Sequence, residues 1–269
     1  MNTTIAHISD IHFGRIVHPR IVEHLLQEIN DLCADVVVVS GDLTMRARRH
    51  EFEAAAAMLD AFTSPVIVVP GNHDVYPWFQ PYRRLTRPLG RYRKYISENL
   101  APSYQRNGLA VLGISSAHGR TIKGGRVTGV ERRTIKDFFE GQNRRVFKVL
   151  VLHHHLTKIQ ALAPHDVARQ ARKALEMASH VGVDLILCGH LHISHIEPLE
   201  VMPERHRIVI ASAGTATSDR GRGARPDSNL YNVIRVYPDA FEIEERLYDP
   251  AAHGFIRHGN VRFERTFTL

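Results

Sequence analysis

Short apolar runs, each followed by polar residues, organise this chain. They are rich in β-branched residues and occur at 5–8, 36–39, 66–69, 109–114, 146–152, 185–187 and 208–211. Between several of them lie amphipathic or alanine-rich helical patterns, at 20–32, 51–62 and 166–180. Apolar strands that alternate with such helices are typical of an α/β architecture in which the sheets are buried under helices. Near the C-terminus, the apolar–polar alternation of 231–236 and 241–248 predicts a closing antiparallel pair.

Length and composition narrow the class of protein. A chain of 269 residues fits one domain, so we expect a single domain over residues 1–269. The net charge of +7 favours an anionic substrate or partner. Cys33 and Cys188 are too far apart in sequence to indicate a disulfide framework, and the N-terminus lacks the basic segment of a secretion signal, so we expect a cytoplasmic protein. The apolar runs are too short for a transmembrane segment.

Two segments depart from the strand–helix alternation. Residues 76–107 interleave aromatic side chains with arginines and one lysine, which predicts a small, partly helical insertion that caps a site. The alternative is a solvated helical face with its aromatic residues packed inward. Residues 215–229 form a Gly/Arg/Ser-rich stretch that is either irregular or an anion-binding rim.

The polar residues that follow the apolar runs share one chemical theme. Asp10 and His12 in HISDIHFG are two residues apart, so both side chains leave the same face of an extended segment, and His190 and His192 in LILCGHLH repeat that spacing. The other motifs are VVVSGDLT with Asp42, VVPGNHD with Asn72 and His73, and VLVLHHH with His153. Each could be an ordinary strand exit, but five together at the ends of predicted strands indicate a ligand site.

The chemistry of these side chains indicates a metal centre. Mixed oxygen and nitrogen donors suit Mn²⁺, Fe²⁺/Fe³⁺ or Zn²⁺. Seven candidate ligands exceed what one tetrahedral ion takes, so we expect two ions, and the carboxylate of Asp42 is the natural bridge. Two metals roughly 3.5–4 Å apart are the standard clamp for displacement at phosphorus. His154 and His155 are either core residues or support for the site. The candidate ligands are Asp10, His12, Asp42, Asn72, His153, His190 and His192.

The ordered set Asp-x-His, Gly-Asp, Gly-Asn-His-Asp, His and Gly-His-x-His resembles the calcineurin-like metallophosphoesterase superfamily and spans residues 10–192. The resemblance implies a four-layer α/β/β/α sandwich with a dinuclear centre and a metal-bound hydroxide as the attacking group. It implies one metal on Asp10, His12 and His192, the other on Asn72, His153 and His190, and Asp42 as the bridge.

The same resemblance assigns a catalytic role to the turn after the third run. It implies that His73 stands near the phosphate and assists the leaving oxygen or stabilises the transition state. An imidazole there can donate a proton near neutral pH. We expect Asp74 to orient His73 or hold its tautomer.

Within the superfamily, the chain is most similar to the bacterial class III cyclic-nucleotide phosphodiesterase group, through Gly-Asp-Leu-Thr, Gly-Asn-His-Asp and the stretch AGTATSDRGRGARPDSNLYNVIRV. Leu156 and Thr157 stand where relatives often carry proline after the histidine run. The expected substrates are cyclic nucleotides or other small phosphodiesters. Side chains suited to phosphate, each either in the pocket or on the plain surface, are Arg15, Arg46, His118, Arg220, Arg222 and Arg225.

Three other classes of function remain open. A membrane-surface lipid pyrophosphohydrolase or phospholipid phosphodiesterase would use residues 76–107 as its lipid-facing cap, through peripheral membrane contact. The positive charge of the chain would suit a nuclease. Such enzymes usually carry further DNA-binding parts, so nucleic acid is not the favoured substrate. A non-catalytic scaffold would have lost ligands, and all seven are present here. Homo-oligomerisation is compatible with each of these.

Overall fold

The computed structural model describes residues 2–121, 123–159, 165–201, 207–221 and 228–265. These residues form two six-stranded sheets, the first in the order β12-β11-β10-β1-β2-β3. In the first sheet β1 is parallel to β2 and antiparallel to β10. Its strands are β1 (Thr3–Ile8), β2 (Val36–Val39), β3 (Val66–Val68), β10 (Leu230–Val236), β11 (Ala240–Asp249) and β12 (Gly254–Glu264).

The second sheet has the order β4-β5-β6-β7-β9-β8. Its central strands run parallel to one another, and antiparallel strands β4 and β8 close its two edges. The strands are β4 (Ser103–Arg106), β5 (Leu109–Gly113), β6 (Phe147–Val151), β7 (Leu185–Cys188), β8 (His195–Glu200) and β9 (Arg207–Ser212).

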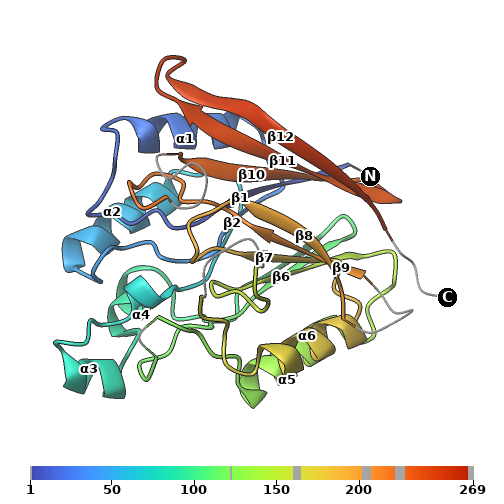
Figure 1. Cartoon of the computed structure of the whole chain (residues 1–269), viewed down its shortest axis with the longest axis horizontal. Helices are drawn as coiled ribbons and strands as arrows, with labels where there is room; N and C mark the ends of the chain where they lie inside the picture. Colours follow the sequence, from blue (N-terminus) through green and yellow to red (C-terminus); the bar gives the residue numbers. More distant parts are fainter. Residues whose placement is uncertain (1, 122, 160–164, 202–206, 222–227, 266–269) are drawn as a thin grey trace.

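Helices cover the outer face of each sheet (Figure 1). Helices α1 (Ile21–Asp31) and α2 (Arg49–Asp60) pack on the first sheet, and α5 (Gly129–Phe139) and α6 (Ala171–His180) pack on the second. The inner strands, such as β2 and β7, are buried on both faces and are apolar on both. In β2, Val36 and Val38 pack between the two sheets, whereas Val37 and Val39 pack beneath the helices. The predicted four-layer α/β/β/α arrangement is confirmed.

Two short helices, α3 (Pro81–Thr86) and α4 (Gly90–Tyr95), follow β3, and β4 then joins the second sheet, so the segment 76–107 ends as an edge strand. The inner side of this segment is fixed to the body of the molecule. Tyr92 is buried, and its Oη donates to the carbonyl of Val68 at 3.0 Å. Arg91 donates to the carbonyl of Ala47 at 2.6 Å. Within the described ranges, no helix is both long and apolar enough to cross a bilayer.

Candidate metal centre

The predicted ligands meet where strands of both sheets end. Asp10 and His12 follow β1, Asp42 follows β2, and Asn72 begins a 3₁₀ turn (Asn72–Asp74) after β3. From the second sheet, His153 follows β6, and His190 and His192 follow β7. The carboxyl ends of these strands thus bring together residues as far apart in the sequence as Asp10 and His192.

Asp10, His12, Asp42 and His192 form the first of two groups. Their candidate ligand atoms all lie within 4.8 Å of one another, and all four residues are buried. Nε2 of His192 lies 3.0 Å from Oδ1 of Asp10 and 3.1 Å from Nε2 of His12. Polar atoms in this group therefore converge on one point.

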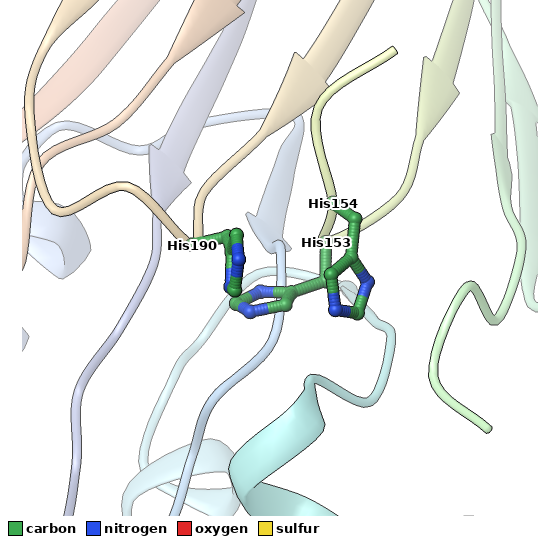
Figure 2. Close-up of side chains that lie close together, drawn as sticks. All are labelled: His153, His154 and His190. Carbon is green, nitrogen blue, oxygen red and sulfur yellow. The ribbon is translucent and has the colours of Figure 1, made fainter. Parts of the chain in front are cut away.

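The second group is built around His153, His154 and His190, whose side chains lie close together in Figure 2. Nε2 of His153 lies 3.2 Å from Oδ1 of Asn72 and 3.3 Å from Oδ2 of Asp42. Because Oδ2 of Asp42 also lies 3.8 Å from Nε2 of His12, this carboxylate faces both groups.

Backbone carbonyls determine which nitrogen of each ring faces the centre. Nδ1 of His12 lies 3.3 Å from the carbonyl of Thr44. Nδ1 of His153 lies 2.8 Å from the carbonyl of Ser40, and Nδ1 of His192 lies 2.7 Å from the carbonyl of Arg220. Since a carbonyl only accepts hydrogen bonds, Nδ1 carries the hydrogen, and the lone pair of the neutral ring lies on Nε2. That tautomer presents each imidazole as a ligand for a cation.

The two carboxylates provide a test of whether cations fit. Oδ2 of Asp10 accepts hydrogen bonds from the Ser9 hydroxyl and the His190 amide, and Oδ1 of Asp42 accepts one from the His73 amide. The remaining oxygens, Oδ1 of Asp10 and Oδ2 of Asp42, are buried, have no hydroxyl or amide donor, and face the Nε2 atoms of His192 and His153. A buried carboxylate oxygen without a donor is costly unless a cation binds it. The oxygen and nitrogen donors therefore fit a dimetal centre.

The electrostatics of the metal-free chain agree with this fit. Burial opposes the charged forms, but the neighbouring histidines hold the pKa of the Asp10 and Asp42 carboxyl groups well below their usual value. Burial also opposes the His153 imidazolium, yet Asp42 and Asp10 outweigh it and raise the pKa of His153 to about 9. A proton on His153 thus partly replaces a cation.

His73 is held from both sides. Its Nδ1 donates to the carbonyl of Met45 at 2.7 Å, and its Nε2 accepts from Nη1 of Arg220 at 2.8 Å. Burial lowers the pKa of His73, against the charge of Asp42. Together these contacts favour a neutral imidazole.

Asp74 does not hold the His73 ring as we expected from the sequence; the carbonyl of Met45 does. The Asp74 carboxylate accepts instead from the amides of Gly71, Leu43 and Thr44 and from the Thr44 hydroxyl. These bonds join the loop after β2 to the turn after β3, which carry Asp42 and Asn72. Asp74 thus supports the site through the backbone.

A cavity of about 320 Å³ opens beside the two groups. Of the predicted substrate contacts, Arg220 lines it. Arg15 is paired with Asp219, and the Arg46 side chain is exposed. His118 faces a different pocket and bonds to the carbonyl of Arg126. Arg222 and Arg225 lie outside the described residues.

Three polar residues that sequence reasoning missed also line this cavity: Lys123, His165 and Asp166. Lys123 precedes two glycines, and His165 and Asp166 form a second His-Asp pair shortly after the histidine run. Either pattern could have drawn attention to them.

The profile of the family described as calcineurin-like phosphoesterase matches residues 3–194. The chain belongs to this family. It is a metal-dependent phosphoesterase, and the matched region contains both groups of the centre.

Relatives of this phosphoesterase include two enzymes named as phosphodiesterases. The 3',5'-cyclic adenosine monophosphate phosphodiesterase CpdA of Haemophilus influenzae is 27% identical over 84% of the chain and 74% of its own length. The glycerophosphodiester phosphodiesterase GpdQ of Enterobacter lignolyticus is 34% identical over 30% of the chain and 32% of its own length. The fold matches that of the purple acid phosphatase PPD1 from yellow lupin seeds with a TM-score of 0.74 at 12% identity, over 99% of this chain and 54% of that one.

Proposed function

We propose that this chain hydrolyses small phosphodiesters in the cavity beside the metal centre, with cyclic nucleotides as the first substrate class to test. The observation that carries the proposal is the pair of buried carboxylate oxygens on Asp10 and Asp42. These oxygens have no hydroxyl or amide donor and face inward-pointing Nε2 atoms of His192 and His153. A cavity of about 320 Å³ suits a small molecule.

Two divalent cations, Mn²⁺, Fe²⁺/Fe³⁺ or Zn²⁺, would be held by the predicted ligands, with Asp42 between them. Bound there, they would act as Lewis acids on the phosphate and lower the pKa of water in the site. His154, which sits beside His153 and His190, is a candidate additional ligand. The first ion would take Asp10, His12 and His192, and the second would take Asn72, His153 and His190.

Arg220 and His73 supply the substrate-facing part of the proposal. Both line the cavity, and the guanidinium of Arg220 suits phosphate oxygens. When Arg220 turns to the phosphate, Nε2 of His73 becomes available to a leaving oxygen. Because its lowered pKa favours the neutral ring, His73 would first take up a proton at Nε2 from the attacking water and would then pass it to the leaving oxygen.

The relatives support a diester rather than a monoester substrate, since both CpdA and GpdQ are named as phosphodiesterases. The cavity has basic side chains, Lys123 and Arg220, on its wall, which suits the negative charge of a phosphodiester. For a nuclease or a lipid pyrophosphohydrolase, the same centre would act on a larger substrate.

A substrate panel tests the proposal. The metal-loaded chain is assayed with bis-p-nitrophenyl phosphate, p-nitrophenyl phosphate, cyclic AMP, single-stranded DNA and a lipid pyrophosphate. Turnover of the small diesters supports the proposal, whereas turnover of DNA or the lipid alone assigns the corresponding alternative. No turnover of any phosphoester by the loaded chain contradicts it.

Two variants separate the roles at the turn after β3. Asn72→Ala is expected to lower metal content as well as kcat, because it removes a ligand. His73→Ala is expected to keep the metal and to slow poor leaving groups more than p-nitrophenolate. If His73→Ala slowed the hydrolysis of substrates with good and with poor leaving groups equally, His73 would not be the proton donor.

A further inference from the structure

Four large apolar side chains are exposed close together in one short segment of the chain. Trp78, Phe79, Tyr82 and Leu85 are 72%, 55%, 79% and 63% exposed. They make up half of the large apolar side chains that are exposed in the described residues, although they lie within eight consecutive positions. Exposed apolar side chains gathered in this way mark an interaction surface.

The other side of the segment is already occupied. Arg84 is buried and donates to the carbonyls of Tyr76 and Thr121, and Arg91 lies over the Tyr76 ring at 5.1 Å. Leu89 and Tyr92 belong to the core beneath α1 and α2. The body of the protein therefore fixes one side and presents the other to the surroundings. Figure 1 shows α3 at the outer edge of the molecule, beyond α4.

The charge of the segment is one-sided. Residues 75–97 contain six basic residues and no acidic one. Arg83 and Arg87 are exposed, and Arg93, also exposed, pairs with Glu98 at 3.3 Å. A surface that combines exposed aromatic side chains with exposed arginines is complementary to an anionic layer with an apolar interior.

We propose that residues 78–87, here called the aromatic–basic edge, dock the protein on anionic lipid bilayers. Trp78, Phe79, Tyr82 and Leu85 enter the interface between headgroups and acyl chains, where tryptophan and tyrosine are favoured. Arg83 and Arg87 stay at the level of the lipid phosphates. The contact is peripheral and reversible.

Two other occupants are less well matched. Single-stranded nucleic acid binds through basic grooves with stacking platforms, whereas α3 projects from the edge of the molecule (Figure 1). A second copy of this chain would bring the same positive charge against the exposed arginines, which repels. Both remain outcomes of the test.

The sequence provides its own probe, because Trp78 is the chain's single tryptophan. The full-length protein is titrated with vesicles of phosphatidylcholine, or of equal parts phosphatidylcholine and phosphatidylglycerol. With the anionic vesicles we expect a blue shift of Trp78 emission, protection from acrylamide and co-sedimentation, all weakened by salt. Unchanged emission, or equal binding to both vesicle types, overturns the proposal.

Matched variants identify the surface. Phe79→Ser with Tyr82→Ser is expected to lose most vesicle binding, whereas Ile256→Ser with Val261→Ser, which changes exposed apolar residues on β12, is expected to keep it. Arg83→Gln is expected to weaken partitioning about fivefold and Arg133→Gln, on α5, to leave it unchanged. Thermal melts confirm that each variant is folded. Equal binding by the variants and their controls overturns the proposal.

The same preparations test the other occupants. Single-stranded DNA that quenches Trp78 and binds through Phe79 and Tyr82, without vesicle binding, would assign the edge to nucleic acid. A concentration-dependent dimer that Phe79→Ser with Tyr82→Ser dissociates would assign it to a second copy. Either result overturns the lipid proposal. These readouts do not involve catalysis, so they are independent of the proposed phosphodiesterase activity.

Discussion

Nη1 of Arg220 donates a hydrogen bond of 2.8 Å to Nε2 of His73, and the backbone carbonyl of Arg220 accepts one of 2.7 Å from Nδ1 of His192. One residue thus holds a candidate metal ligand through its backbone and a candidate catalytic imidazole through its side chain. It therefore links the metal centre to the substrate cavity, whose wall includes all three residues.

Arg220→Ala tests this link. Loss of a charge-assisted hydrogen bond to phosphate costs about 1.5–3 kcal/mol, so we expect kcat/KM for bis-p-nitrophenyl phosphate to fall about 10–100-fold with metal content unchanged. Because Arg220 contacts His73, the effect should not be additive with His73→Ala. Arg46→Ala, which removes an exposed arginine away from this cavity, is the control and should behave as wild type. Additive losses would show that the two residues act separately.

Gly189 is a second test of how the site is built. A Cβ at this position would lie 1.8 Å from Oγ of Ser9 and 2.4 Å from Oδ2 of Asp10, so Gly189→Ala must displace the Asp10 carboxylate. We expect metal affinity to fall about 10–100-fold, the loss typical when support of a ligand is removed. Gly254→Ala, where the nearest heavy atom is 3.9 Å away, should bind metal normally. Isothermal titration with Mn²⁺ measures both, and equal affinities would contradict the assignment of Asp10.

Metal binding should depend on pH in a defined direction. Despite burial, the carboxylates of Asp42 and Asp10 raise the pKa of His153 to about 9, so the metal-free chain carries this proton at neutral pH. A cation on His153 must displace the proton, so apparent affinity should rise up to about tenfold per pH unit below pH 9 and then level off. Titrations in buffers of different ionisation enthalpy count the released protons. Affinity that is constant from pH 6 to pH 8 would contradict a His153 ligand.

The stability of the sandwich should depend on the layer between the sheets. Phe147 of β6 is fully buried, and its ring centroid lies 5.0 Å from that of Phe241 in β11 of the other sheet. Phe147→Ala should therefore lower the free energy of unfolding by about 3–5 kcal/mol in urea denaturation. Val261→Ala, at an exposed position of β12, should change it by less than about 0.5 kcal/mol. If both variants lowered the free energy of unfolding by similar amounts, the layer between the sheets would not be a main source of stability.

The sequence predicts the inner strands well, and the structure brings the predicted ligands together, because strands and ligand motifs both follow local patterns. Strands such as β2 and β7 are apolar on both faces, and the ligand motifs follow them directly. The edge strands cannot be predicted from an apolar pattern. β8 contains Pro198, which an edge strand tolerates, and most residues of β12 are exposed or half-exposed, so neither has an apolar signature.

Local sequence patterns do not predict contacts between segments that are distant in the sequence. Arg220 and His73 are 147 positions apart, and nothing near either residue indicates their hydrogen bond. Asp74 was expected to hold its neighbour His73, but its carboxylate turns toward the amides of Leu43 and Thr44 because these buried donors lie across the turn. Helix α6 begins at Ala171 rather than 166, since Gln170 adopts a left-handed conformation there.

The most direct test of the central claim is the rate of bis-p-nitrophenyl phosphate hydrolysis by the metal-stripped chain as Mn²⁺ is added. We predict no turnover in chelator and a rate that rises until the second equivalent of Mn²⁺ per chain, with Asp42→Asn inactive throughout. Full turnover by the metal-stripped chain, or saturation at a single equivalent, would contradict a two-metal phosphodiesterase centre.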